Sequence, residues 1–415
     1  MKRPQRPRHP SPRQNNPADG PRLKPPMRPL YAIASEPDFV PDRSHAGLWF
    51  DKFCNQWCRN PDPEKTGLAS WSLTAFIIRN GPDKGDYNPK LDWIRTITHH
   101  PVGDSDLLSE HTTRADALAR ALGGQTLVFK TTSRFASGLG REHPIENGFA
   151  WHPVLGVPYL PGSSVKGLVR AWALTWADPK PDPAVRDRIF GARTRKGTVL
   201  FLDALPIKPV QLKADVMTPH YGDYYEGKSP PADWLSPNPI PFLTVAPDQR
   251  FQFALAPATP DAGEDCRTAA GWLEAALKSL GAGAKTAVGY GRFTRDQATE
   301  DRLAKDRKAA NEQASFEARL RTLSPLGREL EQAIHDQKWD ADKNAFTTRG
   351  FTPEWLERLE KDPQPDAIRR LRDLVDRHFP GLLANPDKTV GKKNKPAFKD
   401  RQRELAKRLN ALPHS

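Results

Sequence analysis

Apolar and β-branched residues in the middle of the chain occur in short runs that predict strands. These runs are bounded by turn residues, as strands of a compact domain usually are. They cover residues 70–80, 126–130, 198–203, 240–245 and 251–256. We expect the last two runs to pair around the turn-like Pro247-Asp248, and a final short strand to cover residues 287–293. Alternatively, residues 251–256 are an added strand, which leaves the strand count open.

Two segments carry apolar residues at helical spacing and predict amphipathic helices. The first covers residues 163–177, after a Pro-Gly turn, and the second covers residues 266–280. On the first helix, the residues on or near one face are Val165, Leu168, Val169, Trp172 and Trp176. From residue 126 onward the order is strand, helix, strand, strand, helix, strand. This order predicts an α+β, ferredoxin-like core related to the RNA-recognition motif, a fold whose open sheet face often receives RNA.

The predicted core contains long inserts and is flanked by two segments of different character. Residues 131–161 and 205–238 are irregular connections of a length that usually marks functional loops. Residues 1–30 are rich in Pro, Arg and Lys and predict a disordered basic arm before a core of residues 31–295. Residues 296–415 predict a helical extension that ends in a basic run. A solvated appendage and a partner- or RNA-binding segment both explain this extension.

The composition favours a polyanionic partner. Lys and Arg number 63 against 50 Asp and Glu, a net charge of +13, and neutralising phosphates releases their counterions. A merely soluble basic protein is the alternative. No apolar run is long enough to cross a bilayer, and no signal-peptide pattern is present, so we expect no membrane association. The three cysteines give neither a disulfide framework nor a zinc set, which predicts a cytoplasmic protein without a metal or other cofactor.

A glycine-rich loop, GAGAKTAVGYGRF at residues 281–293, is the first candidate site. Glycine lets backbone N–H groups approach a ligand, and Lys285 and Arg292 add charge for phosphate oxygens. Tyr290 could stack on a base or ribose. A dinucleotide-binding loop is excluded, because that loop follows a strand and opens a helix, whereas this one follows a helix. A tight turn without a ligand is the alternative.

The segment PGSSVKGLVRA at residues 161–171 is the second candidate. It delivers Ser163 and Ser164 to a helix start, with Lys166 and Arg170 one turn apart. The free N–H groups and positive dipole end of a helix favour an anion, and hydroxyls and a lysine add donors. The spacing does not fit a nucleotide P-loop. An ordinary serine cap before an amphipathic helix is the alternative.

Two insert segments complete the candidates. In residues 131–153, Arg134, Arg141 and His143 alternate with glycines, a pattern that suits a nucleic-acid backbone or an ordinary surface loop. In residues 215–227, Asp215 and His220 lie close to tyrosines, including Tyr221. Carboxylates beside a histidine could bind a metal or cut RNA, but no HxH, HExxH or HD doublet accompanies them. A base- or subunit-contacting insert is favoured.

These segments occur together and in order, and the ordered set resembles the RAMP superfamily of CRISPR proteins. The stretches that carry the resemblance lie within residues 126–293 and include SGLGREHPIENGFAWHPVLGVPYLPGSSVKGLVR, IFGARTRKGTVLFLDA, DVMTPHYGDYY, PNPIPFLTV and the glycine-rich loop. The stretches PNPIPFLTV and DVMTPHY are similar in particular to the sixth-subunit family of type III-B (Cmr) complexes. The basic arm and the C-terminal extension are not covered by the resemblance.

The resemblance implies a guide-RNA-binding backbone subunit near the 3′ end of the guide RNA (crRNA), in antiviral defence. It implies target RNA paired to the guide and three kinds of neighbour: the repeated backbone subunit, a small helical subunit and another RAMP subunit. Residues 205–238 correspond in position to a thumb-like element, so His220 and Tyr221 would be insert contacts. Cleavage of the target would belong to the neighbouring repeated subunit, so no catalytic residue is expected here.

Two alternatives remain. One is a RAMP endoribonuclease that processes CRISPR repeat RNA with His143 or His220 in acid–base roles. The other is a purely architectural subunit that contacts other proteins and little RNA.

Overall fold

The computed structural model describes residues 39–54, 56, 58–59, 71–73, 76–78, 85–219, 222–228, 230–232, 239–390 and 395–413. The chain forms two compact units, Met1–Glu300 and Asp301–Ser415. The arm predicted for residues 1–30 lies outside the described residues. No helix in the described part is long and apolar enough to cross a membrane.

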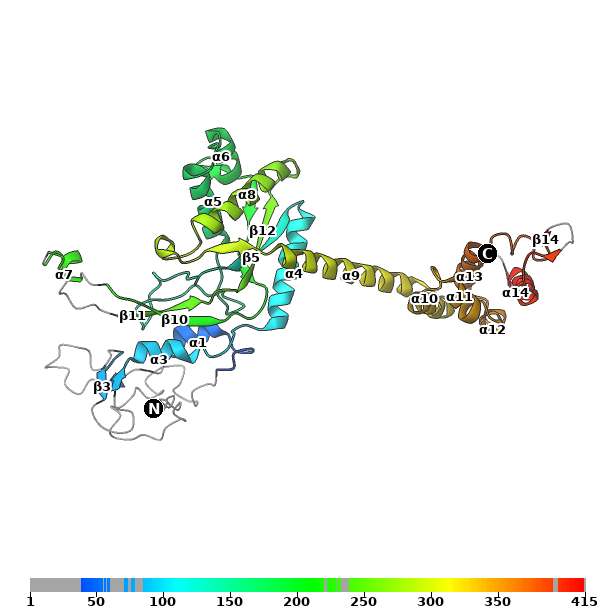
Figure 1. Ribbon diagram of the computed structural model, residues 1–415, viewed down its shortest axis with the longest axis horizontal. Helices are drawn as coiled ribbons and strands as arrows, with labels where there is room; N and C mark the ends of the chain where they lie inside the picture. The colour runs from blue at the N-terminus through cyan, green and yellow to red at the C-terminus, as the bar shows by residue number, and fades with distance from the viewer. Residues whose placement is uncertain are drawn as a thin grey trace, which may run out of the picture. The chain divides into compact units, whose positions relative to one another are not determined.

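The centre of the first unit is an antiparallel sheet covered by helices (Figure 1). Its main strands follow the order β13-β5-β12-β8, and the short β9 also pairs with β12. The bounds are β5 Gln125–Thr131, β8 Val199–Phe201, β9 Leu205–Pro206, β12 Arg250–Pro257 and β13 Phe293–Arg295. Helix α5 (Gly162–Thr175) follows β5, and α8 (Gly263–Ser279) follows β12. The order fourth, first, third, second strand is that of the ferredoxin-like fold, so the predicted α+β class is confirmed.

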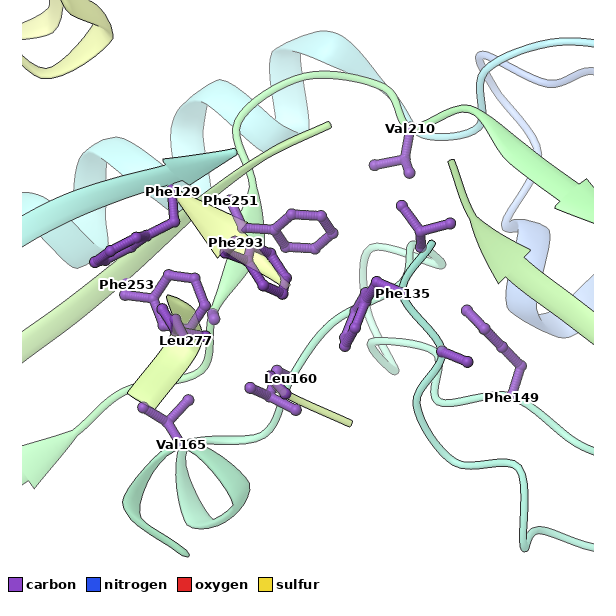
Figure 2. Packing of buried hydrophobic residues seen from close by; sticks show 14 of the residues in the cluster. Phe129, Phe135, Phe149, Leu160, Val165, Val210, Phe251, Phe253, Leu277 and Phe293 are labelled. Carbon is purple, nitrogen blue, oxygen red and sulfur yellow. The ribbon is translucent and has the colours of Figure 1, made fainter. Parts of the chain in front are cut away.

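Aromatic side chains from alternate positions of the strands fill the space between the sheet and α5 and α8. Phe129 and Phe253 meet edge to face at 5.3 Å between ring centroids, and Phe293 packs on Phe253 at 5.9 Å. Figure 2 shows these rings beside Leu277 of α8 and Val165 of α5. Burying such rings in a preferred edge-to-face geometry stabilises this unit beyond the burial of their apolar area alone.

The opposite face of the sheet is covered by α4 (Ser105–Ala121). Ala254 and Ala256 of β12 pack on Ala119 of α4, and Gln252 Nε2 donates to the Thr112 carbonyl at 2.8 Å. Small residues at alternate strand positions let this helix approach the sheet closely. The expectation of an open sheet face for RNA is therefore wrong over the described residues.

The strand pairing after residue 205 differs from the predicted one. Residues 240–245 do form a strand, β11 (Ile240–Val245), but it pairs with β10 (Leu212–Met217) and not with residues 251–256. The core strand in the third position is β12, which pairs with β5 and β8. Apolar runs predict strands, but the partner of a strand depends on contacts distant in sequence. The insert at 205–238 is accordingly not irregular throughout, since it contains β9, β10 and the short α7 (Gly222–Tyr225).

Two further expectations need correction. The last core strand starts at Phe293 and not at residue 287, because a 3-10 turn covers Thr286–Val288 and Gly289 and Gly291 have positive φ angles that a strand does not allow. Helix α5 ends at Thr175, and Trp176 is 60% exposed, outside the apolar face on which it was expected. The helix buries the smaller Val165, Val169 and Ala173 against the core.

Short elements complete the first unit. They are α1 Ala46–Lys52, β1 Cys58–Arg59, β2 Trp71–Ser72, β3 Phe76–Ile78, β4 Gly85–Tyr87, α3 Pro89–Thr96, α6 Pro183–Phe190, β6 Gly191–Ala192, β7 Arg195–Lys196 and the 3-10 turn η3 Pro260–Ala262. Cys54 and Cys266 are free thiols, and both are buried in the way that small apolar side chains are.

The second unit is helical and has an apolar core of its own. Its elements are α9 Gln297–Thr322 (which begins in the first unit), α10 Pro325–Gln337, α11 Lys343–Ala345, the π-turn η5 Phe346–Gly350, α12 Pro353–Lys361, α13 Pro365–His378, β14 Thr389–Val390, β15 Lys395–Pro396 and α14 Asp400–Ala411. Buried Trp339, Phe346 and Leu371 belong to this core, and Leu405 and Leu409 of α14 join it. The C-terminal helical extension is therefore a packed unit.

Three of the cations near the end of the chain are paired inside this second unit. Arg408 of α14 donates two hydrogen bonds to Glu360 of α12, both at 2.9 Å. Lys407 and Arg403 lie 2.7 and 3.4 Å from Asp387. These basic side chains connect α14 to the rest of the unit and are less available to an external polyanion than their number indicates.

We predict that Phe253→Ala destabilises the first unit by about 3–5 kcal/mol, because the lost ring leaves a cavity between β12 and the helices. Hydrogen exchange of peptides covering β5 and β12 measures this change. The control is Leu200→Ala on β8, whose side chain is exposed and whose removal should cost less than ~1 kcal/mol. Equal exchange in both variants would contradict the assigned packing.

Candidate nucleic-acid interface

The glycine-rich loop lies directly on the segment that follows β5. Ala284 N donates to the Ala136 carbonyl and Gly291 N donates to the Arg134 carbonyl, both at 2.7 Å. At Gly283, with φ +83°, a Cβ atom would lie 2.1 Å from the Ala136 oxygen. Only glycine allows the two backbones to approach this closely. The glycines are therefore required by packing against the basic loop, whatever else the loop binds.

The basic segment is held in place by a buried aromatic residue next to its arginine. Phe135 is fully buried among Phe251 and Phe293, as Figure 2 shows, and its backbone exchanges two hydrogen bonds with Val245 of β11. This anchoring fixes the neighbouring Arg134 between the core sheet and the β10–β11 pair. The position of Arg134 thus follows from the packing of its apolar neighbour.

Three segments predicted separately meet at Asp215 of β10. Arg134 Nη1 lies 2.7 Å from Asp215 Oδ2 and donates to the Ala214 carbonyl at 2.9 Å. The Tyr290 hydroxyl donates to the same Asp215 oxygen at 2.5 Å. The basic loop, the glycine-rich loop and the insert are thereby joined through one carboxylate. Asp215 acts as a hydrogen-bond acceptor between two donors, an arrangement that gives it a structural role.

Tyr290 is held in its neutral form by this environment. Burial raises the pKa of Tyr290 to about 12, and the hydrogen bond to Asp215 and the negative charge of that residue add to the effect. The phenol is therefore a permanent donor at neutral pH. Its ring lies 6.0 Å from that of Phe242 on β11.

Lys285 is the cation of the glycine-rich loop that remains open to a ligand. It has a left-handed backbone conformation, φ +58°, and its Nζ lies 5.6 Å from the centre of the Phe242 ring. No carboxylate lies within ion-pair distance of Lys285 among the described residues. Arg292 instead supports the loop, since its Nη2 donates to the Thr286 carbonyl at 3.3 Å and its backbone N donates to Ser133.

Of the other two residues predicted in the basic loop, one is exposed and one is buried. Arg141 is exposed, and its carbonyl accepts from Gly148 N at 2.9 Å, which closes the loop. The His143 side chain is 2% exposed, with its ring 4.6 Å from the Phe50 ring and Nε2 3.0 Å from the Phe50 carbonyl oxygen. An RNA contact would require this ring to leave its packing on Phe50, so His143 is not part of the candidate interface.

The start of α5 lacks the serine cap that was the alternative to an anion-binding helix start. Pro161 is the N-cap residue, no side chain caps the helix from that position, and Gly162 N donates to Asp203 Oδ1 at 2.6 Å. A carboxylate thus already occupies the first amide of the helix. Ser163 and Ser164 are exposed beside it. Lys166 and Arg170, farther along the helix, line a separate cavity that includes no residue of the glycine-rich loop.

The predicted insert contacts His220 and Tyr221 lie outside the described residues. Next to them, α7 carries Tyr224 and Tyr225, which are 48% and 77% exposed and have ring centroids 5.6 Å apart. Figure 1 shows α7 beyond the ends of β10 and β11, away from the core sheet. Among the described residues, no group of three or more His, Cys, Asp or Glu side chains could hold a metal ion.

Sequence reasoning missed Phe242 and the arginines of residues 191–197. Phe242 was part of an expected core strand, and only the β10–β11 pairing brings it to Lys285 and Tyr290. The stretch GARTRKG carries a signal that is visible in the sequence, because three cations occur within four residues.

Comparison with known proteins connects these features to one group. The RAMP superfamily model matches residues 126–294. The CRISPR system Cmr subunit Cmr6 of Pyrococcus furiosus is 34% identical over 302 residues, which cover 58% of this chain and 87% of the relative. The Cmr6 subunit of Saccharolobus solfataricus is 32% identical over 236 residues, covering 55% and 72%.

Solved structures were also matched. The crystal structure of Cmr6 from Pyrococcus furiosus is 30% identical, covers 42% of this chain and 98% of that chain, and has a TM-score of 0.28. A cryo-EM structure of the type III-B Cmr-beta complex bound to cognate target RNA contains a chain that is 25% identical, with 50% and 71% covered and a TM-score of 0.42.

The burial of His143 predicts a pH dependence of stability. Burial lowers the pKa of His143 below 6.5, so the neutral ring contributes stability above that pH, and this contribution is lost as the pH falls through the lowered pKa. We expect the free energy of unfolding to fall between pH 7 and pH 5 in the wild type and to fall less in His143→Asn. His100→Asn, at an exposed position, should keep the wild-type pH dependence. Denaturant titrations at several pH values measure the difference, and equal slopes in all three proteins would contradict it.

Proposed function

Because the chain belongs to the Cmr6 family of CRISPR RAMP proteins, we propose that it binds guide RNA (crRNA) as a subunit of a type III-B RNA-targeting complex in antiviral defence. The membership rests on two relatives above 30% identity, of which this chain covers 87% and 72%. The matched residues 126–294 contain the core sheet, α5, α8 and the glycine-rich loop. The proposed function therefore belongs to the first unit.

The observation that carries this proposal is the position of Lys285. Its charge is unpaired among the described carboxylates, and the loop that carries it is fixed by backbone bonds to residues 134–136 and by Tyr290. A cation held on a rigid loop loses little entropy when it meets a phosphate oxygen. Phosphate contacts of this kind position a nucleic acid without reading its sequence, as a subunit that accepts any guide requires.

The remaining interface residues follow from the same geometry. We propose the exposed Arg141, and Arg134, whose carbonyl accepts from Gly291 of the glycine-rich loop, as further basic contacts, with Arg292 and Tyr290 as supports of the loop. Ser163 and Ser164 at the start of α5, with Lys166 and Arg170, form a second group of donors. The exposed tyrosines of α7 support a thumb-like role for the insert, in which His220 and Tyr221 would contact bases or a neighbouring subunit.

Several finer features are part of the proposal. The subunit would lie near the 3′ end of the guide, with target RNA paired to that guide. Its neighbours would be the repeated backbone subunit, a small helical subunit and another RAMP subunit, all in the cytoplasm. Residues 31–295 would form the RNA-binding core, residues 1–30 a basic arm, and residues 296–415 a separate helical extension.

We propose binding and not catalysis for this chain. The burial of His143 and the hydrogen bond of its Nε2 to Phe50 remove the one described histidine that was a candidate acid or base. A RAMP endoribonuclease would cut repeat RNA at defined positions. Incubation of the purified protein with precursor RNA tests this alternative, and site-specific cuts that disappear in His220→Ala would refute the binding-only proposal.

We predict that Lys285→Ala weakens binding of the full chain to a single-stranded RNA of guide length by roughly tenfold, and lowers the slope of log Kd against log salt by about 0.7. Fluorescence anisotropy at several salt concentrations measures both quantities. Lys278→Ala removes an exposed lysine of α8 near the loop and is the matched control. Identical affinity and slope in the two variants would exclude Lys285 as a phosphate contact.

A further inference from the structure

A second basic site lies outside the glycine-rich loop, in a cavity of about 450 Å³. The cavity is bounded by α5, the end of α6, the β6–β7 hairpin and β8. Its cationic lining residues are Lys166, Arg170, Arg193, Arg195 and Lys196. No acidic residue in the part of the chain that the structure describes lines it. Two of its cations were expected at the RNA interface, and the three from the hairpin were not.

The hairpin is a rigid support for its arginines. β6 and β7 pair in the register Gly191↔Lys196 and Ala192↔Arg195, so Arg193 lies in the connecting turn. At Gly191, with φ +84°, a Cβ atom would lie 2.7 Å from Gly197 N, so the base of the hairpin has no room for a side chain. The two cations of α5 are four residues apart and share one face of that helix. Two separate elements therefore converge on one space.

The charges around this cavity are not balanced. None of its five cations lies within 4.0 Å of a carboxylate oxygen among the described residues, whereas the nearby Arg188 is paired with Asp265 at 2.8 Å. Asp187 interacts with Arg195 and Arg170 at longer range, and it is bonded to Arg186 at 2.7 Å. The pKa of Asp187 is lowered mainly by Arg186, with smaller contributions from Arg195 and Arg170. Like charges held together without counter-charges favour an anion between them.

We propose that this cavity binds successive phosphates of a single RNA strand, a second contact that is separate from the glycine-rich loop. The inference rests on the proposed RNA-binding function, and it adds the hairpin residues Arg193 and Arg195 to the residues that contact RNA. The polar side chains of the cavity are donors only, and guanidinium groups match the geometry of phosphate oxygens in paired hydrogen bonds. An RNA strand presents one charge at every nucleotide, which suits closely grouped cations better than the sparser carboxylates of an acidic protein surface.

The test compares Arg193→Ala/Arg195→Ala with Arg114→Ala/Arg267→Ala in the full chain. The control removes two exposed arginines, of α4 and α8, each paired with a glutamate on its own helix. Anisotropy with a single-stranded RNA of guide length should show roughly tenfold weaker binding for the hairpin variant, and a slope of log Kd against log salt lower by about 1.4. The control should bind like the wild type. Arg170→Ala replaces an exposed residue of α5, so its effect does not depend on folding of the hairpin. This variant should also bind RNA more weakly than the wild type.

The outcomes separate this inference from the proposed function. Wild-type affinity and slope in the hairpin variant, together with weaker binding in Lys285→Ala, would overturn the cavity proposal and leave the proposed function standing. Absence of RNA binding by the wild-type chain would overturn both. If a poly-glutamate peptide binds more tightly than RNA, and the hairpin variant loses that binding, the cavity accepts an acidic protein segment and the RNA assignment is wrong.

Discussion

The position of β12 between β5 and β8 determines most of the first unit. This strand pairs along both edges and alternates its side chains between two helical layers. Phe251 and Phe253 pack toward the core that contains α8, and Ala254 and Ala256 pack on α4. Because every residue of the strand has a fixed neighbour on one face or the other, its register admits no slip. The loops at the ends of β5 and α8 are then brought together at the same end of the sheet.

The elements that could be predicted are those whose signal is local. The two core helices, the runs that became β5, β8, β11 and β12, and the ferredoxin-like class follow from periodicity and order along the chain. The partner of β11 did not follow, because pairing with β10 depends on contacts that no local pattern contains. The same reason explains Phe242: its role at the glycine-rich loop exists only through that pairing.

Charge was an unreliable guide to individual site residues. His143 occurs in a basic, glycine-containing loop, yet its ring packs on Phe50, because an aromatic surface and a carbonyl acceptor are both available there. In the basic run at the end of the chain, Arg403, Lys407 and Arg408 are paired with Asp387 and Glu360. By contrast, Arg193 and Arg195 lie in a short hairpin without paired carboxylates among the described residues. Residue type shows where positive charge exists, and only the fold shows which charge remains uncompensated.

The shared carboxylate of Asp215 has a consequence for communication within the molecule. It lies on β10, whose far end continues toward α7, and it binds both Arg134 and Tyr290. A displacement of the β10–β11 pair relative to the basic loop would act directly on these bonds and on the loop that carries Lys285. Binding of a partner at α7 and binding of RNA at the glycine-rich loop would therefore be thermodynamically linked. Each binding event would change the affinity of the other by the same factor. Asp215 is thus the residue that couples the β10–β11 pair to the basic loop and to the glycine-rich loop.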